Sequence, residues 1–325
     1  MAARTTVLYV LDFNVGNTGD DPEDPFAAGR VAIGSAAGGN LKTLIDHERM
    51  PDGIDVLEDV GHIIWTQMGH PDKNDGMVQS SSMDGRNVKT LFDNGEIHTP
   101  KQVIVDRASY KVYVCDREGL RVHRSNLDGS EKEVLVKRGD WQNADHRKDK
   151  ALHCVGIAVD SIHGKFYWTQ KGPSKGGQGR IFRANIDMPA GKTAEDRDDI
   201  ELLFDRLPEP IDLEIDSETQ TLYWTDRGDP PKGNTLNKAD VSGSSATNAK
   251  RDDYQILAKH LHEAIGIKVD DVKKHIYVTD LGGSVYRYDM DGSNCVKLFE
   301  GQGVYTGIAL AHLEAGQAKE LYCIA

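Results

Sequence analysis

Four side chains that can donate a hydrogen bond or transfer a proton stand at matching places in the sequence, at or just before short apolar segments. They are Lys101, Gln102, His153 and Tyr305. If these segments converge in the fold, such groups could orient a ligand carbonyl, move a proton, or stabilise negative charge that develops on an oxygen. The alternative is that each is a hydrated residue at the rim of a channel. We predict these four as catalytic residues.

Other side chains near the same segment starts could bind a substrate. Most are polar and occupy equivalent positions, at or just before the segment start, when the apolar segments are aligned with one another. A methionine and a tryptophan could form the apolar walls of the site. The tryptophan lies in a polar loop, where its ring could cover an apolar ligand or pack the loop against the protein. The predicted substrate-binding residues are Asp52, Met68, Trp141, Glu209, Asp212, Glu263 and Thr306.

The sequence shows no motif of a nucleophile or a metal site. His153 and Cys154 are adjacent in an extended segment, so their side chains are expected to point to opposite faces rather than form a dyad. The acidic stretch 17–25 could offer oxygen ligands to Ca²⁺, but it lacks the ordered spacing of a calcium-binding loop, which favours a solvated loop. We therefore predict no bound metal and no cofactor.

The charge balance makes some partners unfavourable. The chain has 325 residues, with 39 basic and 52 acidic side chains and a formal net charge of −13. Phosphate backbones and anionic lipid repel such a chain, and no apolar run approaches the roughly 20 residues that span a bilayer. Asp12 comes too early for a secretory signal, and the four cysteines suggest neither a disulfide framework nor metal ligation. We predict a cytoplasmic protein that binds neither nucleic acid nor membrane, with its oligomeric state left open.

A repeat of about 50 residues carries these side chains. Its most visible part is a five-residue word that recurs along the chain and often combines an aromatic residue with Thr and an acid or amide. The words are LYVLD (8–12), IIWTQ (63–67), VYVCD (112–116), FYWTQ (166–170), LYWTD (222–226) and IYVTD (276–280).

Each full repeat predicts four strands. An alternating apolar segment such as GIAVD (156–160) precedes the word, and two further strand-like segments follow it. Six such repeats describe a β-propeller with six four-stranded antiparallel blades. Residues 305–312 match a first strand and the N-terminus begins at a second strand, so the two ends are expected to pair and close the ring. Either 7–12 or 320–325 could supply the second strand there. We predict a single domain over residues 1–325.

The repeated words resemble the YWTD repeat of the six-bladed propellers of the LDL-receptor class. IYVTDLGGSVYRYDMDGS (276–293) and VYVCDREGLRVHRSNLDGS (112–130) follow that pattern of strand, acidic turn, strand and DG turn closely. The resemblance covers nearly the whole chain and implies the fold. It implies little about function, because functional sites are added to a fold independently.

A narrower resemblance comes from the loops after the second strands, such as KGPSKGGQG (171–179), RGDPPKGN (227–234) and MGHPDKNDG (68–76). They look like the loops of stand-alone fungal YWTD-type propellers. Some of those proteins are pericyclases that join a tropolone-derived quinone methide to a sesquiterpene by a hetero-Diels–Alder reaction. The resemblance implies apolar terpene and polyketide-derived substrates, and no catalytic motif carries over residue by residue.

The position of the long loops predicts where a site would lie. Loops that lead into first strands and loops that follow second strands share one face of a propeller, the top face, and the longest loops here belong to these two classes. We predict a pericyclase that binds and orients its substrates in a top-face pocket. The alternatives are a scaffold that binds a peptide or protein, and a metal-dependent lactonase-like hydrolase that would use Glu209, Asp212, Glu263 and Asp52.

Overall fold

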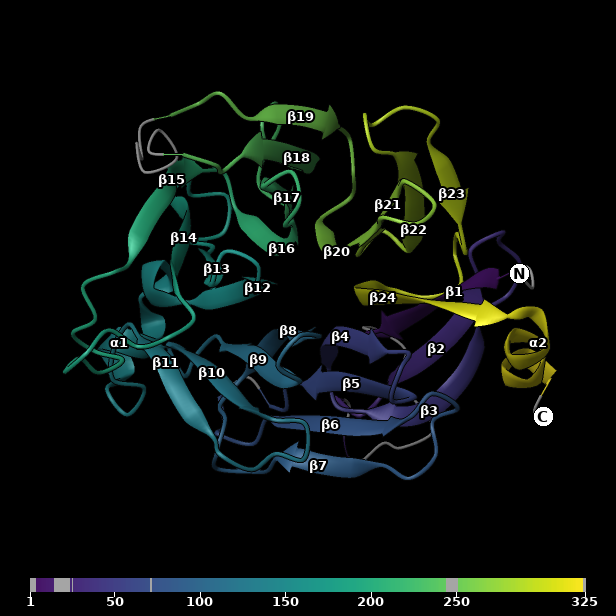
Figure 1. Ribbon diagram of the computed structural model, residues 1–325, viewed down its shortest axis with the longest axis horizontal. Coiled ribbons are helices and arrows are strands. Elements are labelled where there is room, and N and C mark those ends of the chain that lie inside the picture. The colour runs from purple at the N-terminus through teal and green to yellow at the C-terminus, as the bar shows by residue number, and fades with distance from the viewer. Residues whose placement is uncertain (1–3, 15–23, 25, 71, 244–250, 324–325) are drawn as a thin grey trace.

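The computed structural model describes residues 4–14, 24, 26–70, 72–243 and 251–323, and these residues form a six-bladed β-propeller (Figure 1). Each blade is a four-stranded sheet whose neighbouring strands pair antiparallel. The fold predicted from the repeat is therefore confirmed. The innermost strand of each blade packs against the innermost strands of the two neighbouring blades, and together these six strands surround the central channel.

The strands follow the order of the chain from the channel outward, except in the blade that joins the two ends. That blade contains β24 (Tyr305–Glu314), β1 (Arg4–Asp12), β2 (Gly29–Ser35) and β3 (Lys42–Glu48). The second blade contains β4 (Pro51–Leu57), β5 (His62–Gln67), β6 (Met77–Ser82) and β7 (Lys89–Phe92). The third blade contains β8 (Pro100–Asp106), β9 (Lys111–Asp116), β10 (Arg121–Asn126) and β11 (Glu133–Lys137). The fourth blade contains β12 (Cys154–Asp160), β13 (Lys165–Gln170), β14 (Gly179–Asn185) and β15 (Glu201–Leu207). The fifth blade contains β16 (Pro210–Asp216), β17 (Thr221–Asp226), β18 (Thr235–Asp240) and β19 (Gln255–Ala258). The sixth blade contains β20 (Ala264–Asp270), β21 (His275–Asp280), β22 (Ser284–Asp289) and β23 (Val296–Leu298).

The two ends of the chain close the ring in one blade. Strand β1 pairs with β24, with Val7 opposite Ala311 and Tyr9 opposite Ala309. The N-terminal segment 7–12 is thus the second strand of this blade. The C-terminal residues form helix α2 (Ala315–Cys323), which packs against β24 and β1, so 320–323 do not compete for the strand position.

The repeated words build the contacts between blades. Trp224 is fully buried beside Phe204 of the preceding blade, whereas its neighbour Tyr223 packs with Leu261 and Ile276 on the side of the following blade. Successive side chains in a strand point to opposite faces, so one word supplies an aromatic ring to each of two interfaces. The aromatic pair of the repeated word therefore has a structural role, because it joins its blade to both neighbouring blades.

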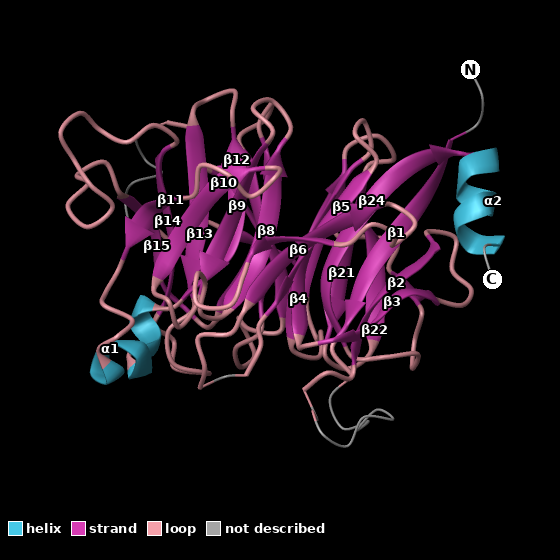
Figure 2. Cartoon of the chain, turned by 90° about the horizontal axis from the view of Figure 1, so that it is seen from below, coloured by secondary structure: helices cyan, strands magenta, loops and turns pink. Residues whose placement is uncertain are grey.

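The two faces of the ring differ in what they carry. The top face holds the loops into the first strands, including the short helix α1 (Ala144–Lys148) and the 3₁₀ helix Lys150–Leu152. The bottom face holds the turns between first and second strands, and α2 begins where β24 ends on that side. Figure 2 shows the ring from its edge with α1 toward the lower side.

In the described part of the chain, no helix combines the length and apolar character needed to cross a membrane.

Candidate active site

A ring of six buried side chains surrounds the channel near the top face, one from the start of each innermost strand. In ring order they are Thr306 on β24, Asp52 on β4, Lys101 on β8, Val155 on β12, Ile211 on β16 and Ile265 on β20. All are at most 8% exposed. The polar members are contiguous, and so are the aliphatic members, which form one apolar cluster. The ring therefore has a polar half and an aliphatic half.

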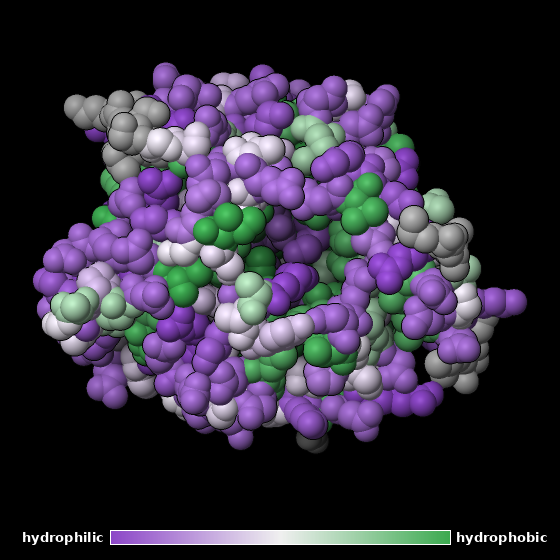
Figure 3. Space-filling view, in the orientation of Figure 1, coloured by the Kyte–Doolittle hydropathy of each residue, from purple (hydrophilic) through white to green (hydrophobic). Residues whose placement is uncertain are grey.

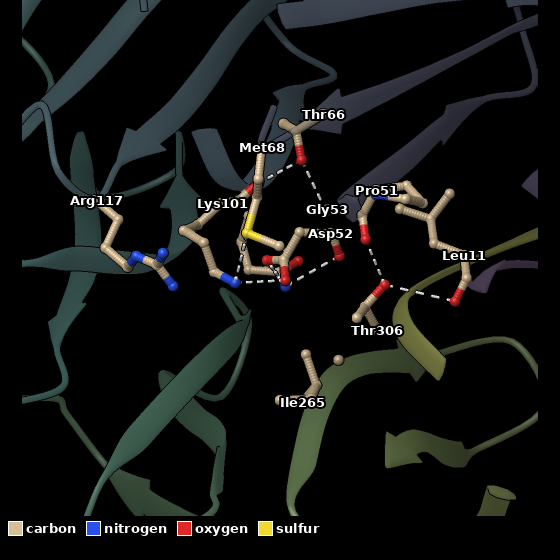
Figure 4. A network of polar contacts seen from close by, with 12 residues as sticks. Leu11, Pro51, Asp52, Gly53, Thr66, Met68, Lys101, Arg117, Ile265 and Thr306 are labelled. Atoms are coloured by element: carbon tan, nitrogen blue, oxygen red, sulfur yellow. Dashed lines mark hydrogen bonds and ion pairs between the residues drawn. The ribbon is translucent and has the colours of Figure 1, made fainter. Parts of the chain in front are cut away.

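The polar half contains a buried ion pair that faces the channel (Figure 4). The Lys101 ammonium donates to Asp52 Oδ1 at 2.5 Å and contacts Met68 Sδ at 3.3 Å. Gln102 Nε2 donates to the other Asp52 oxygen at 3.2 Å. Four of the sequence-predicted residues, Lys101, Gln102, Asp52 and Met68, are thus brought into direct contact. Thr306 joins the same side of the channel, where its hydroxyl donates to the Pro51 carbonyl oxygen at 2.9 Å.

The ammonium of Lys101 loses its proton more readily than an ordinary lysine. Burial removes it from water, and the Arg117 guanidinium adds repulsion, while Asp52 offsets only part of these effects. The result is that the pKa of Lys101 is lowered to about 8. At neutral pH the side chain is a charged donor, yet it lies close enough to its pKa to exchange its proton with a ligand.

The threonine of the repeated word holds the ring in place. Thr66 Oγ1 accepts from Gly53 N at 2.9 Å in its own blade and donates to the Lys101 carbonyl oxygen at 2.7 Å in the next blade. Thr225 links Asp212 N and the Ile265 carbonyl oxygen in the same way, at 3.1 and 2.6 Å. The equivalent contacts of Thr169 and Thr279 reach Ile211 and Thr306. The word that marks the fold therefore also fixes four members of the ring.

Glycine allows the innermost strands to approach closely at this level. A Cβ on Gly156 would lie 2.1 Å from the Ile211 carbonyl oxygen, and one on Gly53 would lie 2.6 Å from the backbone of Gln102. Two blades lack this glycine and carry Gln102 and Asp212 instead. Asp212 is buried and accepts from Leu213 N at 2.9 Å and Ile267 N at 3.1 Å, and burial raises the pKa of its carboxyl group.

Glu209 lies in a second charged cluster on the top face. Its carboxylate binds Lys171 at 3.0 Å and Arg227 at 2.9 Å. Burial alone would raise the pKa of Glu209, but these two cations lower it overall. Glu209 is thus an ionised, fully paired side chain.

The remaining predicted residues lie apart from the ion pair. His153 is buried with Nε2 2.7 Å from the Arg147 carbonyl oxygen, and burial lowers the pKa of His153 to about 4. The Tyr305 hydroxyl donates to the Phe299 carbonyl oxygen at 2.8 Å inside an apolar cluster, where burial raises its pKa. The half-buried Trp141 packs its ring edge-on against His98, with centroids 5.8 Å apart, so it lies against the protein.

The acidic residues of the hydrolase alternative do not gather around a common point. The backbone N–H of half-buried Glu263 donates to Asn234 Oδ1, while Glu209 and Asp52 are each paired with cations. Among the residues that the structure describes, no group of three or more His, Cys, Asp or Glu side chains is placed to hold a metal ion.

The aliphatic half of the ring is not among the residues predicted from the sequence. When the innermost strands are aligned, one column contains Gly53, Gln102, Gly156, Asp212, Gly266 and Gly307, and we call it the glycine column. Val155, Ile211 and Ile265 stand directly before this column, as do Asp52, Lys101 and Thr306. The predicted residues of the same three blades, His153, Glu209 and Glu263, stand two residues further upstream. A strict alignment on the position before the glycine column would have found all six members.

Comparison with known proteins places the chain among fungal relatives. No model of a known protein family matches it. It is 43% identical over 310 residues to "Low-density lipoprotein receptor-related protein 1" of Pyricularia oryzae, covering 93% of this chain and 97% of that protein. It is also 42% identical over 312 residues to "3-hydroxyacyl-CoA dehydrogenase-like protein LAM1" of Cochliobolus heterostrophus, covering 94% of this chain but spanning only 64% of that relative.

Solved structures show the same fold at low sequence identity. A chain of the nidogen/laminin complex aligns with a TM-score of 0.68 at 16% identity and covers 94% of this chain and 98% of that one. TolB from Acinetobacter baumannii aligns with a TM-score of 0.64 at 11% identity, covering 94% and 66%. The gluconolactonase XC5397 from Xanthomonas campestris aligns with a TM-score of 0.55 at 18% identity, covering 79% and 78%. These likenesses concern the fold alone.

Proposed function

The chain belongs to the same family as the low-density lipoprotein receptor-related protein 1 of Pyricularia oryzae, and we propose that it is a small-molecule enzyme that orients two reactants at the top mouth of the channel. The reaction that we propose is an intermolecular hetero-Diels–Alder addition of a tropolone-derived quinone methide to a terpene alkene. The relatives' names do not assign this reaction. The support comes from the chemistry of the ring and from the resemblance of the loops to those of fungal pericyclases.

The observation that carries the proposal is the division of the ring into two halves. A quinone methide has a polar carbonyl oxygen and an apolar reacting carbon, while a terpene alkene is apolar throughout. Lys101 can donate to the carbonyl oxygen from the polar half, and Ile211 and Ile265 offer an apolar surface on the other side of the channel. Polar groups on one side and apolar walls on the other are what a site for such a pair requires.

The proposed step needs no nucleophile and no leaving group. The four-atom C=C–C=O unit of the quinone methide and the two carbons of the alkene exchange three π bonds for two new σ bonds, one C–C and one C–O, and one new π bond. Every atom is retained in the product. The Lys101 N–H withdraws electron density from the carbonyl oxygen as the bonds form, and thereby stabilises charge that develops there.

Orientation would supply most of the acceleration. Holding two reactants in contact can lower a barrier by about 7–11 kcal/mol relative to the bimolecular reaction in water. A single well-placed donor adds about 3–4 kcal/mol when it binds the transition state better than the ground state. Rigid innermost strands, fixed to one another by the threonine contacts, suit this purpose because they hold the donor still.

The dehydrogenase-like name of LAM1 does not lead us to propose hydride transfer for this chain. Dinucleotides usually bind at the carboxyl ends of parallel strands joined by helices. The six blade sheets that the structure describes are antiparallel throughout.

The direct test is to incubate the purified protein with a quinone methide released in situ from a tropolone precursor and with a terpene alkene. We expect the adduct to form faster than without protein and with one stereoisomer in excess. Formation at the spontaneous rate, with the spontaneous mixture of stereoisomers, would overturn the proposal. Bovine serum albumin at equal mass concentration controls for nonspecific apolar binding.

A further inference from the structure

From the geometry of the bottom mouth of the channel, we infer a second ligand site there that is built for a neutral aliphatic alcohol. Figure 3 shows this face hollowed at its centre, with hydrophobic side chains around the opening. The cavity has a volume of about 380 Å³. That lies within the range of small-molecule sites.

A network of four charged side chains forms the floor of this cavity. Lys268 of β20 donates to Glu214 of β16 at 2.7 Å and reaches across the channel to Asp55 of β4 at 3.4 Å. Arg107 binds the same Asp55 at 2.9 Å. Because β20 and β4 are not neighbours in the ring, the network crosses the channel below the ring of six side chains. The bottom cavity is therefore separate from the top mouth.

Aliphatic side chains form part of the walls and of the opening of the cavity, beside the polar residues Asp106, Ser161, Ser217 and Asp271. Ile104, Val159, Ile215 and Leu310 line it, together with Val269. At the opening, Ile162 and Val272 are each 70% exposed, the highest exposure among the large hydrophobic residues that the structure describes. An apolar ligand tail would cover surface that otherwise contacts water.

The floor selects the head group by charge. The two cations and two anions of the floor carry no net formal charge, and Asp106 and Asp271, which also line the cavity, add negative charge, so a carboxylate head would be repelled in this partly buried site. Among the described residues, Glu214 Oε2 has no hydrogen-bond partner, and Lys268 Nζ has two acceptors for its three hydrogens. A hydroxyl group matches both, because it donates to the carboxylate oxygen and accepts from the ammonium.

The test uses 1-octanol, octanoate and octylammonium as probes, each titrated into the full chain by isothermal calorimetry below its micelle or solubility limit. We expect 1-octanol to bind at least tenfold more tightly than octanoate. Equal affinity for 1-octanol and octanoate, tighter binding of octylammonium than of 1-octanol, or no octanol binding up to its solubility would overturn the inference. The measurement involves no reaction, so its outcome is independent of the cycloaddition assay.

Substitutions in the cavity locate the bound probe. Glu214→Gln leaves the floor with one excess positive charge, so octanoate should bind about tenfold more tightly and octanol more weakly; a misfolded variant would not gain affinity for either probe. Val272→Ser should weaken octanol binding about threefold to tenfold. The matched control is Val88→Ser, which alters an exposed valine that does not line the cavity. An octanol affinity that is the same in the wild type and in both cavity variants, Glu214→Gln and Val272→Ser, would overturn the assignment.

The exposed aliphatic opening could instead bind a second copy of the chain. Sedimentation velocity of the wild type, Ile162→Ser and Val272→Ser measures this directly. A monomer at all concentrations is the expected result. A dimer that both serine substitutions dissociate would assign the surface to self-association and overturn the ligand site.

Discussion

The two mouths of the channel each contain a buried lysine, and the two lysines differ in their surroundings. Lys101 at the top has one carboxylate partner, Asp52, and a guanidinium nearby, and its pKa is lowered to about 8. Lys268 at the bottom lies between two carboxylates, Asp55 and Glu214. Burial alone would lower the pKa of Lys268, but the two anions outweigh burial and raise it. The number of neighbouring carboxylates decides the sign of the shift.

This difference separates a lysine suited to chemistry from one suited to structure. The top lysine faces an aliphatic surface across the channel and has a proton that it can share with a ligand. The bottom lysine ties together strands from opposite sides of the ring. The same substitution at the two lysines should therefore have different effects. At Lys268 it should mainly lower stability, and at Lys101 it should mainly lower activity.

The largest effect on stability is expected from Lys268→Met. The substitution leaves Asp55 with Arg107 alone and Glu214 with no cation partner. Removing one member of a buried charge network costs about 3–5 kcal/mol. Urea unfolding followed by tryptophan fluorescence would measure it. The cycloaddition rate per folded molecule should stay within about twofold, and a loss of rate as large as that of a Lys101 variant would contradict the division of roles.

The largest effect on activity is expected from Lys101→Met. Loss of one donor to a developing oxyanion lowers kcat by about 10²–10³. The rate should be measured at saturating substrate and normalised to the folded fraction, because Asp52 also loses its cation. An unchanged kcat would show that the polar half of the top ring does not act on the reacting oxygen.

The pH dependence of the rate should follow Lys101. Its lowered pKa of about 8 means that the side chain carries its proton below pH 8 and loses it as the pH rises through that value. The ammonium is the donor, so the rate should be constant from pH 6 to 7 and fall about tenfold per unit above pH 8. Lys101→Arg keeps its charge over this range and should give a flat profile to pH 9. The same fall in both proteins would assign the titration to another group.

The smallest effect is expected from Ile265→Val in the aliphatic half. Removing one buried methylene costs about 0.5–1.5 kcal/mol. We expect a rise in KM for the terpene of about twofold to tenfold, with kcat for a small alkene such as styrene unchanged. Val278→Ala, in an apolar cluster between blades, is the control for a general loss of packing. A KM for the terpene that responds equally to both substitutions would remove the aliphatic half from the site.

The fold could be predicted from the sequence because the pattern of a four-stranded blade recurs six times along the chain. Each copy supplies residues that join neighbouring blades, as Tyr223, Trp224, Thr225 and Asp226 show for the most complete word. Asp226 accepts from Glu209 N at 3.1 Å and Gly228 N at 2.9 Å, so it secures the loop that leads into its own blade. Such local contacts recur with the sequence and need no knowledge of the rest of the structure.

The ring of six side chains could be predicted only in part. Asp52, Lys101 and Thr306 could be predicted because polar residues stand out among the starts of the aligned apolar strands, whereas Val155, Ile211 and Ile265 have the character of ordinary core residues. The pairing of the innermost strands also shifts near their starts, for example between Pro210 and Leu213. This irregularity breaks the simple alternation of side chains, so counting by two does not tell which residue faces the channel.

The charged network at the bottom of the channel could not be predicted because it depends on a side chain from one blade contacting a side chain across the channel. Lys268 and Asp55 lie more than 200 residues apart in the chain, on strands that are not neighbours. Nothing in the repeat specifies that these two positions oppose each other. The geometry of the closed ring was needed.

The most direct test of the central claim is a crystal structure of the protein with an unreactive tropolone, which presents the carbonyl of the proposed substrate without the reacting carbon. We expect the tropolone at the top mouth, with an oxygen within about 3.2 Å of Lys101 Nζ and its ring edge against Ile211 and Ile265. Binding in the bottom cavity or on the outer surface, with the top mouth free of tropolone, would contradict the proposed site.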